Sequence, residues 1–229
     1  MKKLLIAAIL GTTGLMSAQA AVVTQSDSYG YASTNWNYGL GALNLFDTAL
    51  GTLNKVVVTL TGSINQNLRA ENIGSADTLI PVAGGTISFQ KGTSTTLALV
   101  LPTVTGTGFN ATAYDGVDDK AGTSGKDFGI LSATDSVVVT FDTAAALADF
   151  MGTGTMDGFR LRALGSGIIE SNNGNLSSLV LTEAFGRLDV MYDYTAATTP
   201  PVNGVPEPGS LALMAAGLLG MAAVRRKKA

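Results

Sequence analysis

The sequence contains no histidine and no cysteine, which removes the two side chains most often used for catalysis and transition-metal binding. Histidine is the commonest general base near neutral pH, and cysteine supplies thiolate nucleophiles, disulfides and iron–sulfur ligands. Ser-His-Asp and Cys-His catalysis, thiolate zinc sites and disulfides are therefore excluded. Carboxylates are the only catalytic acids and bases that remain in quantity.

If the chain is an enzyme, the chemistry open to it is carboxylate-dependent glycoside hydrolysis. The candidates are the scarce glutamates Glu71, Glu170 and Glu183, and the pair Asp189 and Asp193. The two aspartates are four residues apart on one face of a predicted strand, so at ~3.3 Å per residue they stand about 13 Å apart. A catalytic carboxylate pair needs about 5–9.5 Å. We therefore expect solvated surface carboxylates, no catalytic residue and no enzymatic activity, with the hydrolase kept as an alternative.

Four aromatic side chains gather within ten residues, and they include the only tryptophan of the chain: Tyr29, Tyr31, Trp36 and Tyr38. Beside the amides of Asn35 and Asn37, such rings are suited to stacking on sugar rings, which predicts carbohydrate contact. The alternative is that the rings pack in the core with the phenolic oxygens at the surface. Core packing is the commoner arrangement, and we adopt it.

An acidic loop offers one candidate metal site, for calcium, at Asp115, Asp118 and Asp119. Carboxylate oxygens on a glycine-containing loop are ligands that calcium accepts. The run lacks the alternating aspartates and the late glutamate of an EF-hand loop. A charged surface turn is the interpretation we adopt, so no cofactor is expected and calcium stays the alternative.

The charge is segregated between the middle and the two ends of the chain. Residues 21–208 contain 8 basic and all 17 acidic residues, a net charge of −9, whereas six basic residues lie at the extreme ends. An acidic body repels phosphate backbones, so nucleic-acid binding is not expected. The positive charges lie where membrane targeting would use them.

The first 20 residues have the three parts of a secretory signal peptide. Lys2 and Lys3 form the charged start, an apolar helix-forming run follows, and Ala18-Gln19-Ala20 supplies the small residues that signal peptidase needs. Cleavage is therefore predicted before Ala21, with Ala18, Ala20 and Ala21 around the cleavage site. The mature protein is expected to cross the inner membrane.

The C-terminal end consists of a proline-rich linker at 196–209 and an apolar helix with a basic tail at 210–229. The uncharged residues 208–224 would span about 25 Å as a helix at ~1.5 Å per residue. This is slightly less than the ~30 Å hydrocarbon core, and lysine and arginine side chains can extend to cover the difference. A transmembrane helix with its end on the cytoplasmic side is predicted.

The order of these C-terminal elements resembles the PEP-CTERM sorting signal of Gram-negative bacteria. The residues that carry the resemblance are Val205-Pro206-Glu207-Pro208, the apolar helix, and Arg225, Arg226, Lys227 and Lys228. The resemblance implies recognition by an exosortase, processing near the Pro-Glu-Pro box, and delivery to the cell surface or extracellular matrix. A permanent tail anchor needs the same helix, and the residues alone do not separate the two.

The middle of the chain, residues 21–195, predicts an all-β domain. Alternating or β-branched segments occur at Val22–Ala32, Lys55–Ile64, Gly85–Phe89, Leu97–Leu101, Ser136–Asp142, Leu176–Phe185 and Arg187–Thr195. In the last of these, one face is expected to carry Leu188, Val190, Tyr192 and Tyr194, and the other Arg187, Asp189, Met191 and Asp193. Glycine- or asparagine-rich breaks, including Gly84-Gly85, favour an antiparallel β-sandwich of the jelly-roll or immunoglobulin-like kind. One short helix is expected at Thr143–Phe150, capped by Asp142.

This middle segment also resembles the choice-of-anchor E domain, over roughly Ala21–Tyr194. The resemblance rests on the order of short motifs, among them Thr34-Asn35-Trp36-Asn37, Tyr114-Asp115-Gly116 and Gly152-Thr153-Gly154-Thr155. It implies a fold and an external location, and it adds no catalytic residue.

The chain is thus expected to be an exported surface or matrix protein of structural or adhesive type. A carbohydrate-binding module that uses the aromatic cluster is the first alternative, and the hydrolase is the second. The expected partners are signal peptidase, an exosortase, the inner membrane before processing, and an exopolysaccharide of the matrix.

Overall fold

We describe residues 20–197 of the chain in a computed structural model; the predicted signal peptide and the C-terminal linker, helix and basic tail lie outside this range. Two antiparallel sheets account for most of these residues. The all-β class and the packing of two sheets are therefore confirmed, while the jelly-roll or immunoglobulin-like assignment stays a prediction. Within residues 20–197, no helix has the length and apolar character needed to cross a membrane.

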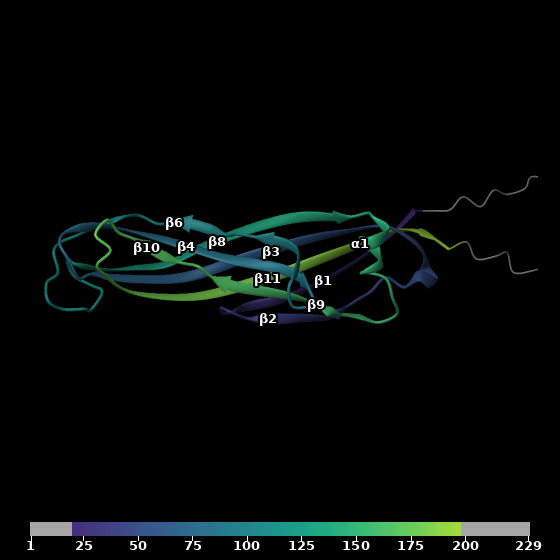
Figure 1. Cartoon of the computed structure of the whole chain (residues 1–229), viewed down its shortest axis with the longest axis horizontal. Coiled ribbons are helices and arrows are strands. Elements are labelled where there is room, and N and C mark those ends of the chain that lie inside the picture. The colour runs from purple at the N-terminus through teal and green to yellow at the C-terminus, as the bar shows by residue number, and fades with distance from the viewer. Residues whose placement is uncertain (1–19, 198–229) are drawn as a thin grey trace, which may run out of the picture. The chain divides into compact units, whose positions relative to one another are not determined.

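The first sheet has four strands in the order β1-β11-β3-β8. Their bounds are Ala20–Ser33 for β1, Leu176–Ala196 for β11, Gly51–Asn72 for β3 and Gly125–Phe141 for β8. Figure 1 shows the long strands β3, β8 and β11 running lengthwise beside one another. The two predicted segments Leu176–Phe185 and Arg187–Thr195 are one continuous strand, because β3 pairs with both along its whole length.

The second sheet is built around β4 (Asp77–Lys91). One edge of β4 pairs with β9 (Thr155–Gly165) and then with the short β10 (Ile168–Glu170), and β2 (Asn37–Asn44) pairs with the far side of β9. The other edge pairs in turn with β5 (Thr95–Val100), β6 (Thr103–Thr105) and β7 (Phe109–Ala111). Along each edge of β4 the neighbouring strand is therefore divided into shorter strands, whereas β4 itself is continuous.

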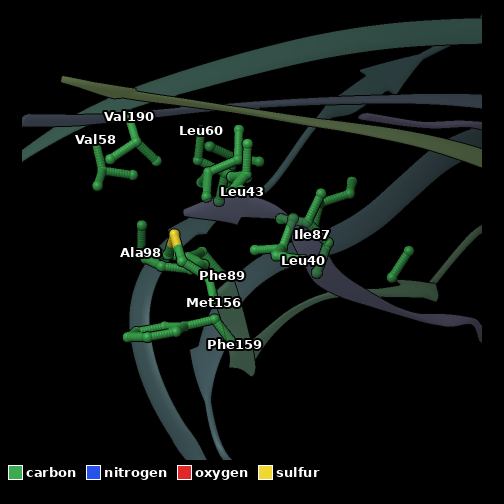
Figure 2. Packing of buried hydrophobic residues seen from close by; sticks show 14 of the residues in the cluster. Leu40, Leu43, Val58, Leu60, Ile87, Phe89, Ala98, Met156, Phe159 and Val190 are labelled. Carbon is green, nitrogen blue, oxygen red and sulfur yellow. The ribbon is translucent and has the colours of Figure 1, made fainter. Parts of the chain in front are cut away.

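The core lies between the two sheets and follows the period-two alternation of their strands. Val58 and Leu60 of β3 and Val190 of β11 face Ile87 and Phe89 of β4. Figure 2 shows this apolar layer, with Leu40 of β2 and Met156 and Phe159 of β9 closing it. The expected inward face of β11 is confirmed, since Leu188, Val190 and Tyr192 are buried and Tyr194, just after a register shift, packs half-buried against the same core.

Two local expectations are wrong. The short helix α1 (Ala144–Ala148) forms where predicted, but its N-cap is Thr143, whose hydroxyl accepts a hydrogen bond from the Ala146 N–H; Asp142 is not the cap. The pair Gly84-Gly85 does not end a strand, since both residues lie inside β4. Glycine is required at position 85, because a Cβ there would overlap the side chain of Ile64 in the facing sheet. A 3-10 turn, η1 (Thr48–Leu50), completes the described elements.

Candidate functional site

The predicted processing residues lie mostly outside the described range. Ala18, the box Val205-Pro206-Glu207-Pro208 and the basic residues Arg225, Arg226, Lys227 and Lys228 all fall there. Ala20 and Ala21 are the first two residues of β1, and they pair with Thr195 and Tyr194 at the end of β11. The first and last described strands are thus neighbours, and the described chain begins and ends at the same end of the first sheet. Helix α1 lies near that end (Figure 1).

The aromatic cluster divides into inward and outward side chains. Trp36 is only 8% exposed and belongs to the core, where its indole Nε1 donates to the Ala184 carbonyl at 3.2 Å. Tyr29 packs edge-on against Trp36 at 4.9 Å between ring centroids. A ring held in this way has no free face for a ligand, so Trp36 is not available for carbohydrate stacking.

Tyr38 of β2 also points inward, where the edge strands β1 and β2 of the two sheets come together. Its ring stacks on Tyr29 at 4.9 Å, and its hydroxyl donates to Asp27 Oδ1 at 3.2 Å. Burial, followed by the negative charge of Asp27, raises the pKa of Tyr38 above its ordinary value. The other oxygen of Asp27 is buried without a hydrogen-bond partner. These three aromatic residues therefore serve packing, as the commoner interpretation held.

Tyr31 differs from the other three because a β-bulge turns it to the opposite face. Tyr29 pairs with Gly186 and Ala32 pairs with Ala184, so Gly30 and Tyr31 together oppose the single residue Phe185. The extra residue reverses the alternation, as bulges do. Tyr31 is 49% exposed on the outer face of the first sheet, and its ring lies 5.7 Å from that of Phe185 at a 36° tilt.

Phe185 was not identified from the sequence as a site residue. It lies in an alternating segment, and only the pairing of β11 with β1, about 150 positions apart in the chain, places it beside Tyr31. The alternation of the strand could have identified it. Ala184 and Leu188 face the core, so a phenylalanine at an odd-numbered position of this strand must face outward.

The calcium candidates are each engaged within the protein. Asp115 and Asp119 accept hydrogen bonds from backbone N–H groups two residues later, at Val117 and Ala121. Asp118 pairs with the Lys120 ammonium at 2.7 Å and accepts from Ser177 Oγ at 2.7 Å. The Lys120 and Ser177 hydrogen bonds hold the pKa of Asp118 below its ordinary value. In residues 20–197 no three carboxylates converge as a metal site would require.

Glu71 has the most unusual environment among the candidate catalytic carboxylates. It is fully buried, and its Oε2 accepts a 2.7 Å hydrogen bond from the backbone N–H of Lys120. Its Oε1 has no hydrogen-bond partner in the structure, and the neighbouring Ser124 Oγ is also unpaired. Lys120 adopts φ of 57°, an uncommon conformation for a residue with a side chain. Glu71 therefore holds the loop 112–124 against the end of β3, which is a structural role.

The other candidate carboxylates lie on exposed surfaces. Asp189 is bound by the Arg187 guanidinium through contacts of 2.6 to 3.1 Å, and Asp193 pairs with Lys55 at 3.4 Å. Glu183 lies on the outer face of β11, and Glu170 ends the short strand β10. The structure does not bring Glu71, Glu170 and Glu183 into one group of three.

Comparison with known families identifies the C-terminal segment. Residues 204–227 match the PEP-CTERM protein-sorting motif. Such a signal implies export and sorting by an exosortase, and it marks proteins exported to the cell surface of Gram-negative bacteria. The resemblance to choice-of-anchor E domains over Ala21–Tyr194 stays a prediction.

Comparison with curated proteins finds no match. Among solved structures, the chain is similar to one titled "Structure of infectious bursal disease virus Gx strain", with 14% identity over 84% of this chain, 41% of that chain and a TM-score of 0.19. A Maize Chlorotic Mottle Virus structure matches with 10% identity, 81% of this chain, 99% of that chain and a TM-score of 0.15. The chain thus spans less than half of the first of these proteins, and likeness at these scores carries no conclusion about fold or function.

Proposed function

We propose that the chain is an exported structural or adhesive protein of the extracellular matrix, delivered by an exosortase and lacking enzymatic activity. The observation that carries the proposal is the PEP-CTERM match at residues 204–227. Signal peptidase acts first, and the apolar helix then holds the chain in the inner membrane until the exosortase acts at the Pro-Glu-Pro box. The mature protein joins the exopolysaccharide matrix of a biofilm.

The physical properties of the sheet domain support this role. The domain has no cysteine, so its folding does not depend on disulfide formation outside the cell. Its stability rests on one long apolar core between two sheets and on strands of up to 22 residues. The described carboxylates are either engaged in structural contacts or exposed on the surface, which favours a binding or structural role over hydrolysis.

The proposal is tested by replacing Pro206, Glu207 and Pro208 with alanine in the host bacterium. We expect the variant to stay at its unprocessed mass in the membrane fraction, while the wild-type protein is shortened near the box and reaches the surface. The matched control replaces Pro200 and Pro201, which lie in the same linker outside the match, and is processed normally. Intact chain in the soluble cell interior, or normal processing of the box variant, would overturn the proposal.

A further inference from the structure

The outer face of the first sheet carries an aromatic pair, one ring exposed and the other half-buried, among polar side chains and exposed aliphatic ones such as Leu181 and Val138. Tyr31 and Phe185 lie side by side there, and Tyr31 leaves nearly half of its surface exposed. Ser63 of β3 is directly opposite Phe185; it is buried itself, and it shares a 2.8 Å hydrogen bond with the exposed Thr134 of β8. An aromatic platform flanked by hydroxyl groups combines an apolar stacking surface with donors and acceptors.

Hydroxyl and amide side chains extend this surface across the neighbouring strands. Thr61 and Ser136 form one cross-strand pair at 3.3 Å, and Asn65 accepts from Ser132 at 2.7 Å. Each hydroxyl both donates and accepts, so a ligand rich in hydroxyl groups can replace the water on this face without leaving polar groups unpaired.

Two open hollows lie on either side of the aromatic pair along β11. One, of about 410 Å³, is lined in part by Thr59, Arg187 and Met191. The other, of about 510 Å³, is lined in part by Asn67 and Leu181. From Leu181 to Met191 the strand extends about 33 Å at ~3.3 Å per residue. A track of this length with a central aromatic pair fits an extended chain better than a compact small molecule.

The charges on this face favour a neutral ligand. Three cations lie on the outer face of this sheet, and each is paired with an aspartate: Lys55 with Asp193, Arg69 with Asp127 and Arg187 with Asp189. A polyanion would have to compete with these carboxylates for its partners. The carboxylate of Glu183 lines the 510 Å³ hollow and adds further repulsion.

We propose that the outer face of the β1-β11-β3-β8 sheet binds a neutral, extended polysaccharide, with Tyr31 and Phe185 as its stacking platform. This inference rests on the proposed function, since it names the matrix component that the exported domain contacts. It also replaces the predicted cluster of Tyr29, Tyr31, Trp36 and Tyr38 with a pair in which only Tyr31 is retained.

The test is affinity electrophoresis of the purified protein in gels that contain hydroxyethylcellulose, galactomannan or dextran, with alginate as the polyanion. We expect retardation by at least one neutral polysaccharide. The Tyr31→Ala and Phe185→Leu variants should bind about tenfold more weakly, because each removes one stacking ring. The ring-preserving variants Tyr31→Phe and Phe185→Tyr should keep the affinity of the wild type.

Tyr114→Ala is the matched control, because it removes a similarly exposed tyrosine from the loop 112–124. Thermal unfolding of every variant identifies any loss of fold; if Phe185→Leu is unfolded, Tyr31→Ala decides, since its side chain is half exposed. The inference is overturned if no neutral polysaccharide retards the protein, if the ring-removing variants bind as the wild type does, or if alginate is the preferred ligand. Because this binding needs no sorting enzyme, its failure is distinct from failure of the processing experiment.

Discussion

The side-chain amide of Gln66, on β3, forms a closed pair of hydrogen bonds with the backbone of Gly84, on β4 of the facing sheet. Its Oε1 accepts from the Gly84 N–H at 2.8 Å, and its Nε2 donates to the Gly84 carbonyl at 2.9 Å and to Thr182 Oγ1 at 2.7 Å. The position is the gap between β9 and β10, where β4 lacks a neighbouring strand. The amide thus supplies the acceptor that no strand offers to the Gly84 N–H, and it shares the Gly84 carbonyl with the backbone N–H of Ser166. Gly167 leaves room for it, since a Cβ there would overlap the Gln66 side chain.

Replacing Gln66 by alanine is expected to lower the free energy of unfolding by about 2 kcal/mol, because the Gly84 N–H would be left buried without an acceptor. Urea unfolding followed by tryptophan fluorescence measures the change. Asn65→Ala is the control from the adjacent, outward-facing position, and it should cost less than about 1 kcal/mol. Equal losses in the two variants would show that the inter-sheet amide contributes nothing particular.

Replacing Glu71 by alanine is expected to release the loop 112–124, because the Lys120 N–H loses its only described acceptor. Limited trypsin digestion should then cut after Lys120 faster than in the wild type, with the fragments identified by mass spectrometry. Glu71→Gln retains an acceptor oxygen and should leave the loop protected. Rapid cleavage of the glutamine variant, or slow cleavage of the alanine variant, would contradict this role for Glu71.

Asp77 predicts a specific acid dependence of stability. The backbone N–H of Asn173 and the hydroxyl of Ser171 donate to this carboxylate and hold its pKa well below the ordinary value. Because the pKa is depressed, the ionised Asp77 carboxylate makes its full contribution to the free energy of unfolding above about pH 4, and this contribution is lost as the pH falls below that value. The Asp77→Asn variant should therefore be less stable than the wild type at pH 7, with the difference shrinking toward pH 2. Asp142→Asn, at an exposed position, is the control and should show no such convergence.

Tyr192 predicts the opposite dependence at alkaline pH. Burial raises the pKa of Tyr192 to about 12, although the hydrogen bond from Gln25 opposes the shift. Because the side chain ionises near pH 10 in the unfolded chain, the contribution of neutral Tyr192 to the free energy of unfolding is complete below that pH and is lost between about pH 10 and 12. Between pH 7 and 11 the wild type should lose roughly 1 kcal/mol more stability than Tyr192→Phe. Parallel losses in urea unfolding at the two pH values would contradict the assignment.

The sequence predicted those parts of the fold that depend on local alternation. The inward face of β11 and the outward positions of Arg187 and Asp189 follow from the period of two, which needs no knowledge of the partner strand. The interrupted edges of β4 could not be predicted in this way. Gly84 and Gly85 resemble a turn in sequence, and their hydrogen-bond partners Gln66, Ser166 and Pro102 are all distant in the chain.

The candidate site shows the same limit. A cluster of four aromatic residues was visible in the sequence, but strict alternation would place Tyr29 and Tyr31 on one face. The bulge at Gly30 and Tyr31 depends on the register between β1 and β11, which no local pattern encodes. Pairing between distant strands therefore decides which aromatic ring reaches the surface.

The place of β11 in its sheet has a mechanical consequence. The strand leads directly toward the sorting signal, and it is hydrogen-bonded to β1 on one side and to β3 on the other. The bonds of antiparallel ladders lie across the strand direction. A tensile force applied to the C-terminal end along the strand axis therefore loads both ladders in shear, so many bonds must yield together. The same strand carries Phe185, so a pull between the proposed polysaccharide site and the C-terminal end of β11 would be borne by the strand that is paired on both sides.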